Sequence, residues 1–540
     1  MEINKEHLAA FTIATIGNPL FYATIFQATT GGMLPDSALY LTFANNILSN
    51  QQLSVHGWAH IDNGIILSPV YPLLIAITAQ IRADAILNSQ AISSIFLIAA
   101  CYPLYNFTRR NSSNMGGIVC VAIYAWNAKT FFYGTSTLTE SIFISLSIFL
   151  IDAMDRYVST PNSRRAAIIG ALCMLLVLTR QIGIFGPVTF TLVLAYLYRV
   201  RSTSRREIAG DAAVFFVVAA VPAIAYSLAL YIQTGKTPLT QTYRLNKYVV
   251  MTNIAAKDSS IEDYITIYKK RRDDRRLNED ASEIYASLRY EQNLIAPKTG
   301  APIVNYANNI LSNLKLAAST LGFGIFFLFL IGSAYSIVSF IAGRGRIGQI
   351  IIPLATTVYI GILSLVSNKI DRYLEVLHPL IICQIIISIY IITKILSKSK
   401  TREFIIWAAI LALLIALTPH LAFSQKFTRS AGEQDNPLAR CRKHITPNEP
   451  IFSLSTLEPY LLGGYYRALP NDSLDRIAIY AVHTGVRWMI IRKEGAGLTE
   501  LGLYNNSEWL RSPTPLPIQN TNFEAVCSDD DNIATLYRIN

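Results

Sequence analysis

The sequence predicts a multi-pass α-helical membrane protein that carries a small α/β domain at its C-terminus. Of its 540 residues, 52% are hydrophobic and only 15% are charged, whereas soluble proteins carry about 25% charged residues. The apolar residues form repeated runs of roughly 15–25 residues almost free of charge, the length that crosses a bilayer as a helix. The segment 424–540 instead has the composition of a soluble domain.

About eleven apolar runs are long enough to be spans, and a helix suits them because it satisfies its own backbone hydrogen bonds in lipid. The first run lacks a basic leader and an obvious small-residue cleavage site, so we expect a retained helix rather than a signal peptide. In chain order the predicted spans are 7–27, 86–107, 115–133, 138–153, 166–179, 181–198, 211–232, 317–341, 348–367, 377–396 and 403–423.

Basic residues in the connectors orient these spans. The positive-inside rule places them in the cytoplasm, and with a first loop on the outer side the N-terminus would lie there too. The outer side then receives the long loop 233–316 and the domain 424–540, so the transmembrane domain is expected to be 1–423. The basic clusters are Arg109–Arg110, Arg164–Arg165, Arg199–Arg206, Arg344 with Arg346, and Lys398–Arg402. They account for the net charge of +11 without nucleic-acid binding.

One apolar stretch, 66–81, does not fit a simple count of spans. It is short and contains Pro69 and Pro72, and a further crossing there would conflict with the basic clusters or move the N-terminus outside. We interpret it as a re-entrant or interfacial segment that closes a first outer loop, 28–65. The alternative is a full span with 28–65 in the cytoplasm, and the charges alone do not separate the two.

The pattern within 424–540 predicts a small α/β domain on the outer side. Four short runs read as strands and one amphipathic stretch as a helix. Cys441 and Cys527 could form one disulfide if the domain lies in an oxidising compartment. The predicted strands are 450–454, 486–491, 523–527 and 534–539, and the predicted helix is 473–484.

Two carboxylates lie near the ends of predicted spans. Asp36 opens an amphipathic helix, 39–48, directly after the first span. It is placed either to act on a lipid-linked substrate or simply to cap that helix. Glu140 lies at the outer end of a span, where ionisable groups tend to mark function but also favour the helix dipole. Lys129 could pair with it.

Three basic residues, Arg180, Lys369 and Arg372, lie on the outer side, where the positive-inside rule does not expect them. Each is a candidate ligand for phosphate, because a basic side chain can pair with phosphate oxygens, which arginine can do through two parallel hydrogen bonds. The alternative for Arg372 is a salt bridge with Asp371 or Glu375.

His56, His60 and Asp62 in the first loop are residues of the types that bind divalent metals. Their spacing on an irregular loop gives little information about whether they form a metal site. The sequence has no Walker-type loop, no dinucleotide fingerprint and no Cys/His zinc pattern. These absences weigh against ATP-driven transport and nicotinamide chemistry.

Several segments, taken together and in order, resemble the GT-C superfamily of membrane glycosyltransferases. The resemblance is to its protein-mannosyltransferase-like and aminoarabinose-transferase-like bacterial enzymes, and it covers nearly the whole chain. The segments are Pro35–Tyr40 with Ala44, Ser68–Leu74, Thr137–Phe143, Leu178–Gln181 and Asp371–Leu374.

The resemblance implies a polyprenyl-phosphate-sugar donor and transfer to a lipid, glycan or protein at the outer face of a bacterial inner membrane. It implies that Asp36 is the general base of an inverting reaction and that Glu140 positions the acceptor or a divalent metal. Arg372, with Arg180 and Lys369, would neutralise the departing phosphate. Many relatives have a second acid next to the first-loop Asp, whereas this chain has Ser37, so metal use stays open.

Two other classes of function remain as alternatives. A lipid-linked glycan flippase without chemistry predicts polar residues along several mid-membrane helices and an internal repeat, and the sequence shows neither. A membrane scaffold whose tail recruits a partner predicts that Asp36 and Glu140 can be replaced without consequence.

Overall fold

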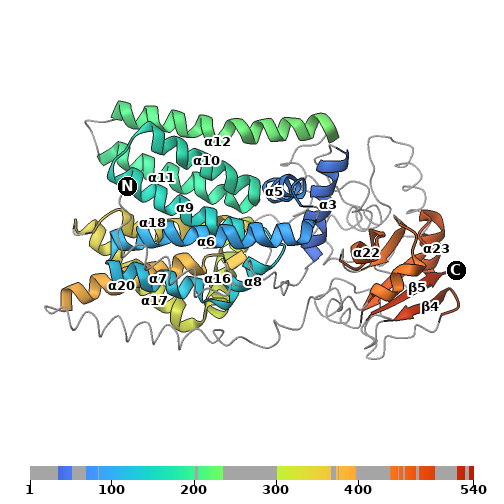
Figure 1. The fold of residues 1–540 in the computed structure, drawn as a ribbon. Coiled ribbons are helices and arrows are strands. Elements are labelled where there is room, and N and C mark those ends of the chain that lie inside the picture. The colour runs from blue at the N-terminus through green and yellow to red at the C-terminus, as the bar shows by residue number, and fades with distance from the viewer. Residues whose placement is uncertain are drawn as a thin grey trace. The chain divides into compact units, whose positions relative to one another are not determined.

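The computed structural model describes residues 35–50, 68–82, 84–200, 205–234, 301–343, 345–365, 373–374, 376–396, 438–447, 449–453, 457–469, 474–492, 520–528 and 534–540. Contacts divide the chain into two units. The helical unit holds α5 to α20, apart from the end of α12, and the second unit holds α3 and the sheet (Figure 1). The predicted spans 7–27 and 403–423 lie outside the described residues.

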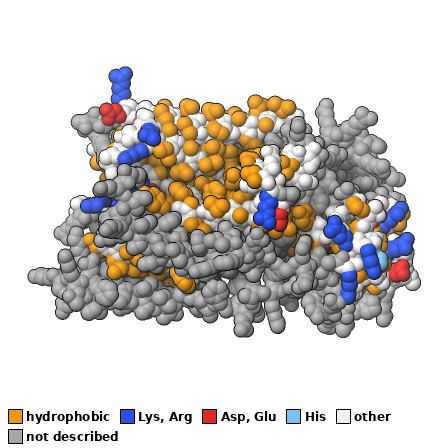
Figure 2. Space-filling model, in the orientation of Figure 1, with side chains coloured by type: hydrophobic (Ala, Val, Ile, Leu, Met, Phe, Trp, Pro, Cys, Tyr) orange, Lys and Arg blue, Asp and Glu red, His pale blue; other side chains and the backbone are white. Residues whose placement is uncertain are grey.

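The helical unit presents an apolar surface. Figure 2 shows hydrophobic side chains over much of the described surface on one face of this unit, and α12 exposes Val217, Val221 and Ile224 by 60%, 56% and 64%. The helices are α5 (Val70–Ala79), α6 (Ala85–Asn111), α7 (Asn114–Ala125), α8 (Ala128–Thr135), α9 (Glu140–Ser159), α10 (Ser163–Thr179), η1 (Gln181–Ile184), α11 (Phe185–Val200), α12 (Arg205–Thr234), α16 (Ala301–Leu321), α17 (Phe323–Ile341), α18 (Gly348–Leu365) and α20 (His378–Leu396).

Within the described ranges, four helical segments are long and apolar enough to cross a membrane, and further apolar helices are shorter. The total of about eleven spans stays a prediction. The long segments are Ala85–Asn111, Gln181–Val200, Arg205–Ile232 and Phe323–Ile341.

Two spans predicted as single helices are broken in the structure. The run 115–133 divides into α7 and α8, because Asn127 is extended and its Oδ1 accepts hydrogen bonds from the backbone N–H groups of Lys129 (2.8 Å) and Thr130 (3.4 Å). Such a cap starts a new helix. The run 317–341 is divided at Gly322, whose φ of +87° is a left-handed conformation that glycine adopts without steric cost.

The stretch 66–81 forms a short helix. α5 has 10 residues, which at about 1.5 Å per residue is about half the thickness of a hydrocarbon core. Pro69 precedes the helix and Pro72 lies in its first turn, where a missing N–H costs little. This length suits an interfacial or re-entrant segment, and its place in the membrane stays a prediction.

The core of the helical unit contains an aromatic cluster that joins three helices. The ring centroids of Phe143 on α9, Phe185 on α11 and Tyr359 on α18 lie 5.4–6.4 Å apart. At the far end of α9, Arg110 pairs with Asp152 at 2.6 Å and with Asp155 at 2.7 Å. α9 is therefore held at both ends of its length, which gives the residue at its start a rigid support.

The second unit contains a five-stranded sheet of order β2-β1-β3-β5-β4. β1 pairs in parallel with β2 and β3, and β5 runs antiparallel between β3 and β4. The α/β composition agrees with the sequence prediction, whereas β2, α22 and η5 were not predicted. The elements are η5 (Ala439–His444), β1 (Pro450–Ser453), α22 (Leu457–Leu462), β2 (Tyr465–Ala468), α23 (Leu474–Thr484), β3 (Trp488–Arg492), β4 (Phe523–Ser528) and β5 (Ala534–Ile539).

Alternation along the strands gives this sheet two buried faces. Met489 and Ile491 of β3 pack in the cluster that contains Ile477 of α23. Trp488 and Ile490 of the same strand pack in the cluster that contains Cys441 of η5, together with Leu462 of α22. Successive residues of a strand point to opposite faces, so both faces of β3 are covered.

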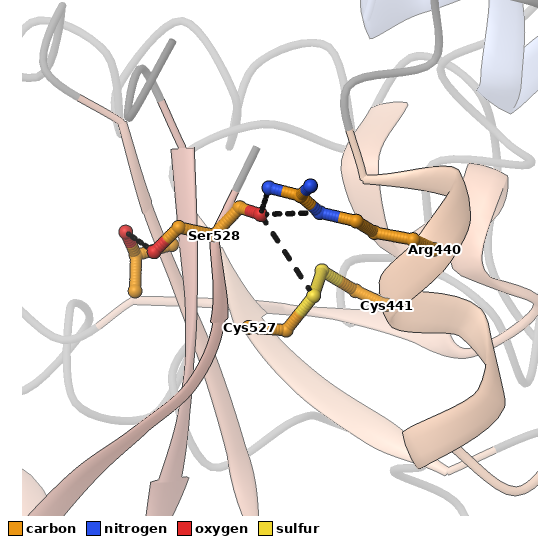
Figure 3. Close-up of a disulfide and its surroundings, with 5 residues drawn as sticks. Arg440, Cys441, Cys527 and Ser528 are labelled. Carbon is orange, nitrogen blue, oxygen red and sulfur yellow. Dashed lines mark hydrogen bonds between the residues drawn. A yellow bond between two sulfur atoms is a disulfide. The ribbon is translucent and has the colours of Figure 1, made fainter. Parts of the chain in front are cut away.

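Cys441 and Cys527 form a disulfide that joins η5 to β4 (Figure 3). Beside it, Nε of Arg440 donates a hydrogen bond to the carbonyl oxygen of Ser528 at 2.7 Å. The cysteines are 86 residues apart in the sequence, so the bond closes a long loop of the unfolded chain.

Replacing both Cys441 and Cys527 by serine is expected to destabilise the sheet domain by about 2–4 kcal/mol, because the cross-link restricts the unfolded chain. Limited proteolysis of the full-length protein over a temperature series measures this. The double variant should be cleaved within the domain at lower temperature, and added reductant should bring the wild type to the same behaviour. Equal resistance of reduced and oxidised wild type would contradict the expectation.

Candidate functional site

Glu140 and Arg180 form a buried ion pair in the helical unit. Nη1 of Arg180 lies 2.5 Å from Oε1 of Glu140, and the two side chains are 9% and 1% exposed. The sequence suggested Lys129 as a partner of Glu140, and Nζ of Lys129 donates to the carbonyl oxygen of Thr320 at 3.4 Å. The structure pairs Glu140 with Arg180.

Helix ends favour both charges of this pair. Glu140 is the first residue of α9, and Arg180 directly follows the last residue of α10. A carboxylate is stabilised at a helix N-terminus and a cation at a C-terminus by the helix dipole. Nη1 of Arg180 also lies 3.3 Å from the hydroxyl of Thr139, which precedes α9.

The backbone around Arg180 is fixed by a turn that only glycine can close. The N–H of Gly183 donates to the carbonyl oxygen of Arg180 at 2.8 Å, and the N–H of Arg180 donates to that of Leu176 at 2.9 Å. A Cβ at Gly183 would lie 2.4 Å from the carbonyl carbon of Leu176, closer than packed atoms allow. The missing side chain lets η1 fold against α10, and this holds Arg180 beside Glu140.

Arg180 also contacts an aromatic residue from a distant part of the chain. Its Cζ lies 4.7 Å from the centroid of the Tyr373 ring, a cation–π arrangement. The hydroxyl of Tyr359 on α18 donates to the carbonyl oxygen of Tyr373 at 2.7 Å. In the sequence Tyr373 directly follows Arg372, one of the predicted phosphate ligands.

Asp36 belongs to the second unit. It lies in the first turn of α3 (Pro35–Asn50), so the predicted helix 39–48 is present and begins before Asp36. The side chain is partly exposed, whereas Ser37 and Ala38 beside it are fully buried. α3 packs against α22, which places Asp36 on a helix that is supported by the sheet domain.

The structure brings together Glu140 and Arg180 of the predicted site residues. Lys369, Arg372, His56, His60 and Asp62 lie outside the described residues. Among the described residues no group of three or more His, Cys, Asp or Glu side chains is arranged to hold a metal ion.

Sequence reasoning missed Thr139, Tyr359 and Tyr373 as members of this site. Thr139 and Tyr373 are direct neighbours of residues that were singled out, Glu140 and Arg372, which is a weak signal. Tyr359 lies within an apolar helix and carried no signal, because its role depends on the packing of α18.

No protein-family model matches the sequence, and no curated protein is significantly similar to it. Solved structures do match. The archaeal oligosaccharyltransferase AglB from Archaeoglobus fulgidus, in complex with an inhibitory peptide and a dolichol-phosphate, has a TM-score of 0.60 at 11% identity, over 93% of this chain and 71% of that chain. The apo form of the A. fulgidus oligosaccharyltransferase has a TM-score of 0.59 at 13% identity, over 97% and 73%.

ArnT from Cupriavidus metallidurans bound to undecaprenyl phosphate matches over 99% of this chain and 98% of its own length at 9% identity, with a TM-score of 0.44. At such identities the oligosaccharyltransferase match is informative about fold. It shows that this chain shares the fold of the A. fulgidus oligosaccharyltransferase.

Proposed function

We propose that this GT-C-fold protein is a glycosyltransferase that moves a sugar from a polyprenyl-phosphate donor to a lipid, glycan or protein acceptor. The reaction takes place at the outer face of a bacterial inner membrane. The observation that carries the proposal is the likeness in fold, along 93% of the chain, to an oligosaccharyltransferase whose structure holds a dolichol-phosphate.

Asp36 is the proposed general base. It lies in the first turn of a helix and is partly exposed, so an acceptor hydroxyl can reach the carboxylate. A carboxylate within hydrogen-bond distance of that hydroxyl takes its proton as the oxygen attacks the sugar. Attack from the face opposite the departing phosphate inverts the anomeric centre.

Lys369 and Arg372 are the proposed ligands of the departing lipid phosphate, because fixed positive charge lowers the barrier where negative charge develops. Arg180 is less suited to this task, since Glu140 lies 2.5 Å from its guanidinium and largely cancels its charge. We assign Arg180 to positioning: it orients Glu140 and contacts Tyr373, the residue after Arg372.

The position of Glu140 does not fit a metal ligand. One of its carboxylate oxygens is already paired with a guanidinium at 2.5 Å, and that fixed cation repels a second one. We therefore assign Glu140 to orienting the acceptor and derive no step through a metal. A divalent ion held by His56, His60 and Asp62 stays a separate prediction.

The proposal is tested with purified protein in lipid vesicles, a radiolabelled set of polyprenyl-phosphate sugars and a membrane extract as acceptor source. We expect label to move from the donor lipid to an acceptor fraction only when the folded protein is present. A parallel assay follows movement of the labelled donor between the two leaflets. Movement between leaflets without any transfer would replace the enzyme by the flippase alternative.

A further inference from the structure

Tyr71 lies at the centre of a buried hydroxyl network between α5 and α6. The side chain is fully buried. Its hydroxyl oxygen lies 3.0 Å from the carbonyl oxygen of Ser89 and 3.0 Å from the hydroxyl oxygen of Ser93. Ser89 and Ser93 are four residues apart on α6, so they lie on the same face of that helix.

The same face of α6 contacts the turn that leads into α9. The hydroxyl oxygens of Ser89 and Thr137 lie 2.7 Å apart. The hydroxyl of Ser93 donates to the carbonyl oxygen of Ser136 at 3.1 Å. The hydroxyl of Ser94 donates to the carbonyl oxygen of Gly134 at 2.7 Å. The end of α8 and the turn 136–139 are thus held to α6 by three buried side chains, and this turn leads directly into Glu140.

The number of hydroxyl hydrogens in this network limits how its hydrogen bonds can be arranged. The hydroxyls of Tyr71 and Ser93 carry one hydrogen each, and these two hydrogens serve three contacts: Tyr71 to Ser89, Tyr71 to Ser93, and Ser93 to Ser136. The hydrogen of Tyr71 is donated to the carbonyl oxygen of Ser89, so the hydrogen of Ser93 serves both the Tyr71 oxygen and the carbonyl oxygen of Ser136. The members of such a network strengthen one another. Without the Tyr71 hydroxyl, Ser89 loses a donor and Ser93 loses a partner that fixes its side chain.

We propose that Tyr71 is a positioning residue that fixes the segment 134–139, which comprises the end of α8 and the turn after it, and, through this segment, the carboxylate of Glu140. Since α5 follows the first loop and α9 begins at Glu140, the network couples the short helix α5 to the proposed acceptor side of the site. The kinetic part of this inference rests on the proposed glycosyl transfer, and the structural part does not.

The test replaces Tyr71 by phenylalanine, which removes the hydroxyl and keeps the ring. Tyr124→Phe is the matched control, because Tyr124 is also buried and its hydroxyl donates to an α6 carbonyl, that of Leu97, at 3.3 Å. The two variants should lose similar thermal stability. Only Tyr71→Phe should speed amide hydrogen exchange in residues 134–143, by about tenfold, as expected for one lost buried hydrogen bond.

Transfer kinetics supply the second measurement. Tyr71→Phe should lower kcat by about tenfold and leave KM for the donor unchanged, whereas Tyr124→Phe should change neither. Adding Ser93→Ala to Tyr71→Phe should cost little more, because residues that act in one network are not additive. Unchanged exchange in 134–143, or altered exchange with a normal kcat, overturns the inference. If wild type transfers no sugar, the proposed function fails, and the exchange data alone decide whether Tyr71 fixes the turn.

Discussion

Asp36→Asn is expected to lower glycosyl transfer by about 10²-fold or more, the contribution of a general base. Asparagine has nearly the same shape as aspartate and keeps a side-chain oxygen that can accept a hydrogen bond, but it cannot take up the proton of the acceptor. The measurement is transfer of radiolabel from the polyprenyl-phosphate donor, with wild type and variant in the same lipid. Binding of the donor lipid should be unchanged, because the base acts on the acceptor.

Asp475→Asn is the matched control for this experiment. Asp475 is also an acidic residue in the first turn of a helix, α23, in the same unit as Asp36. The control therefore removes a negative charge from a comparable position without touching the proposed site, and transfer should be unchanged. Equal transfer by wild type and a folded Asp36→Asn protein would remove Asp36 from the chemistry and leave Asp36 as a helix-start residue.

The helical character of the chain was predictable because lipid imposes one strong rule, that a crossing segment needs a long apolar run. The breaks at Asn127 and Gly322 were not predictable in the same way. The break at Asn127 depends on a side-chain cap, and the break at Gly322 depends on a left-handed φ. The average hydropathy of a run is insensitive to one residue, so it does not reveal either break. The strand β2 was not predicted, although β1 has the same length of 4 residues and was predicted.

The candidate site was predictable as separate residues but not as an arrangement. Glu140 and Arg180 stood out because ionisable groups are rare in apolar sequence. Their pairing depends on the packing of α9 against α10 and on Gly183, which lets η1 approach Leu176. Lys129 is much closer to Glu140 in the sequence, and sequence distance was the only guide to partners before the helices were placed.

Breaking the Glu140–Arg180 pair from either side is expected to destabilise the helical unit by about 3–5 kcal/mol, because it leaves one buried charge without its partner. Glu140→Gln leaves the guanidinium unpaired, and Arg180→Met leaves the carboxylate unpaired. Both side chains are at least nine-tenths buried, so water cannot replace the lost partner. The effect is measured by heating each variant in the same lipid and recording the fraction of protein that stays folded at each temperature.

The double variant Glu140→Gln/Arg180→Met separates a structural role from a functional one. Replacing a whole buried pair by neutral groups is often neutral for stability, so the double variant should regain most of the stability that each single variant loses. If the pair only holds α9 to α10, transfer should recover with stability. If Glu140 orients the acceptor, as proposed, the double variant should be stable yet transfer at least tenfold more slowly than wild type. Full recovery of transfer would make this pair a structural feature and would leave the acceptor side of the site to other residues.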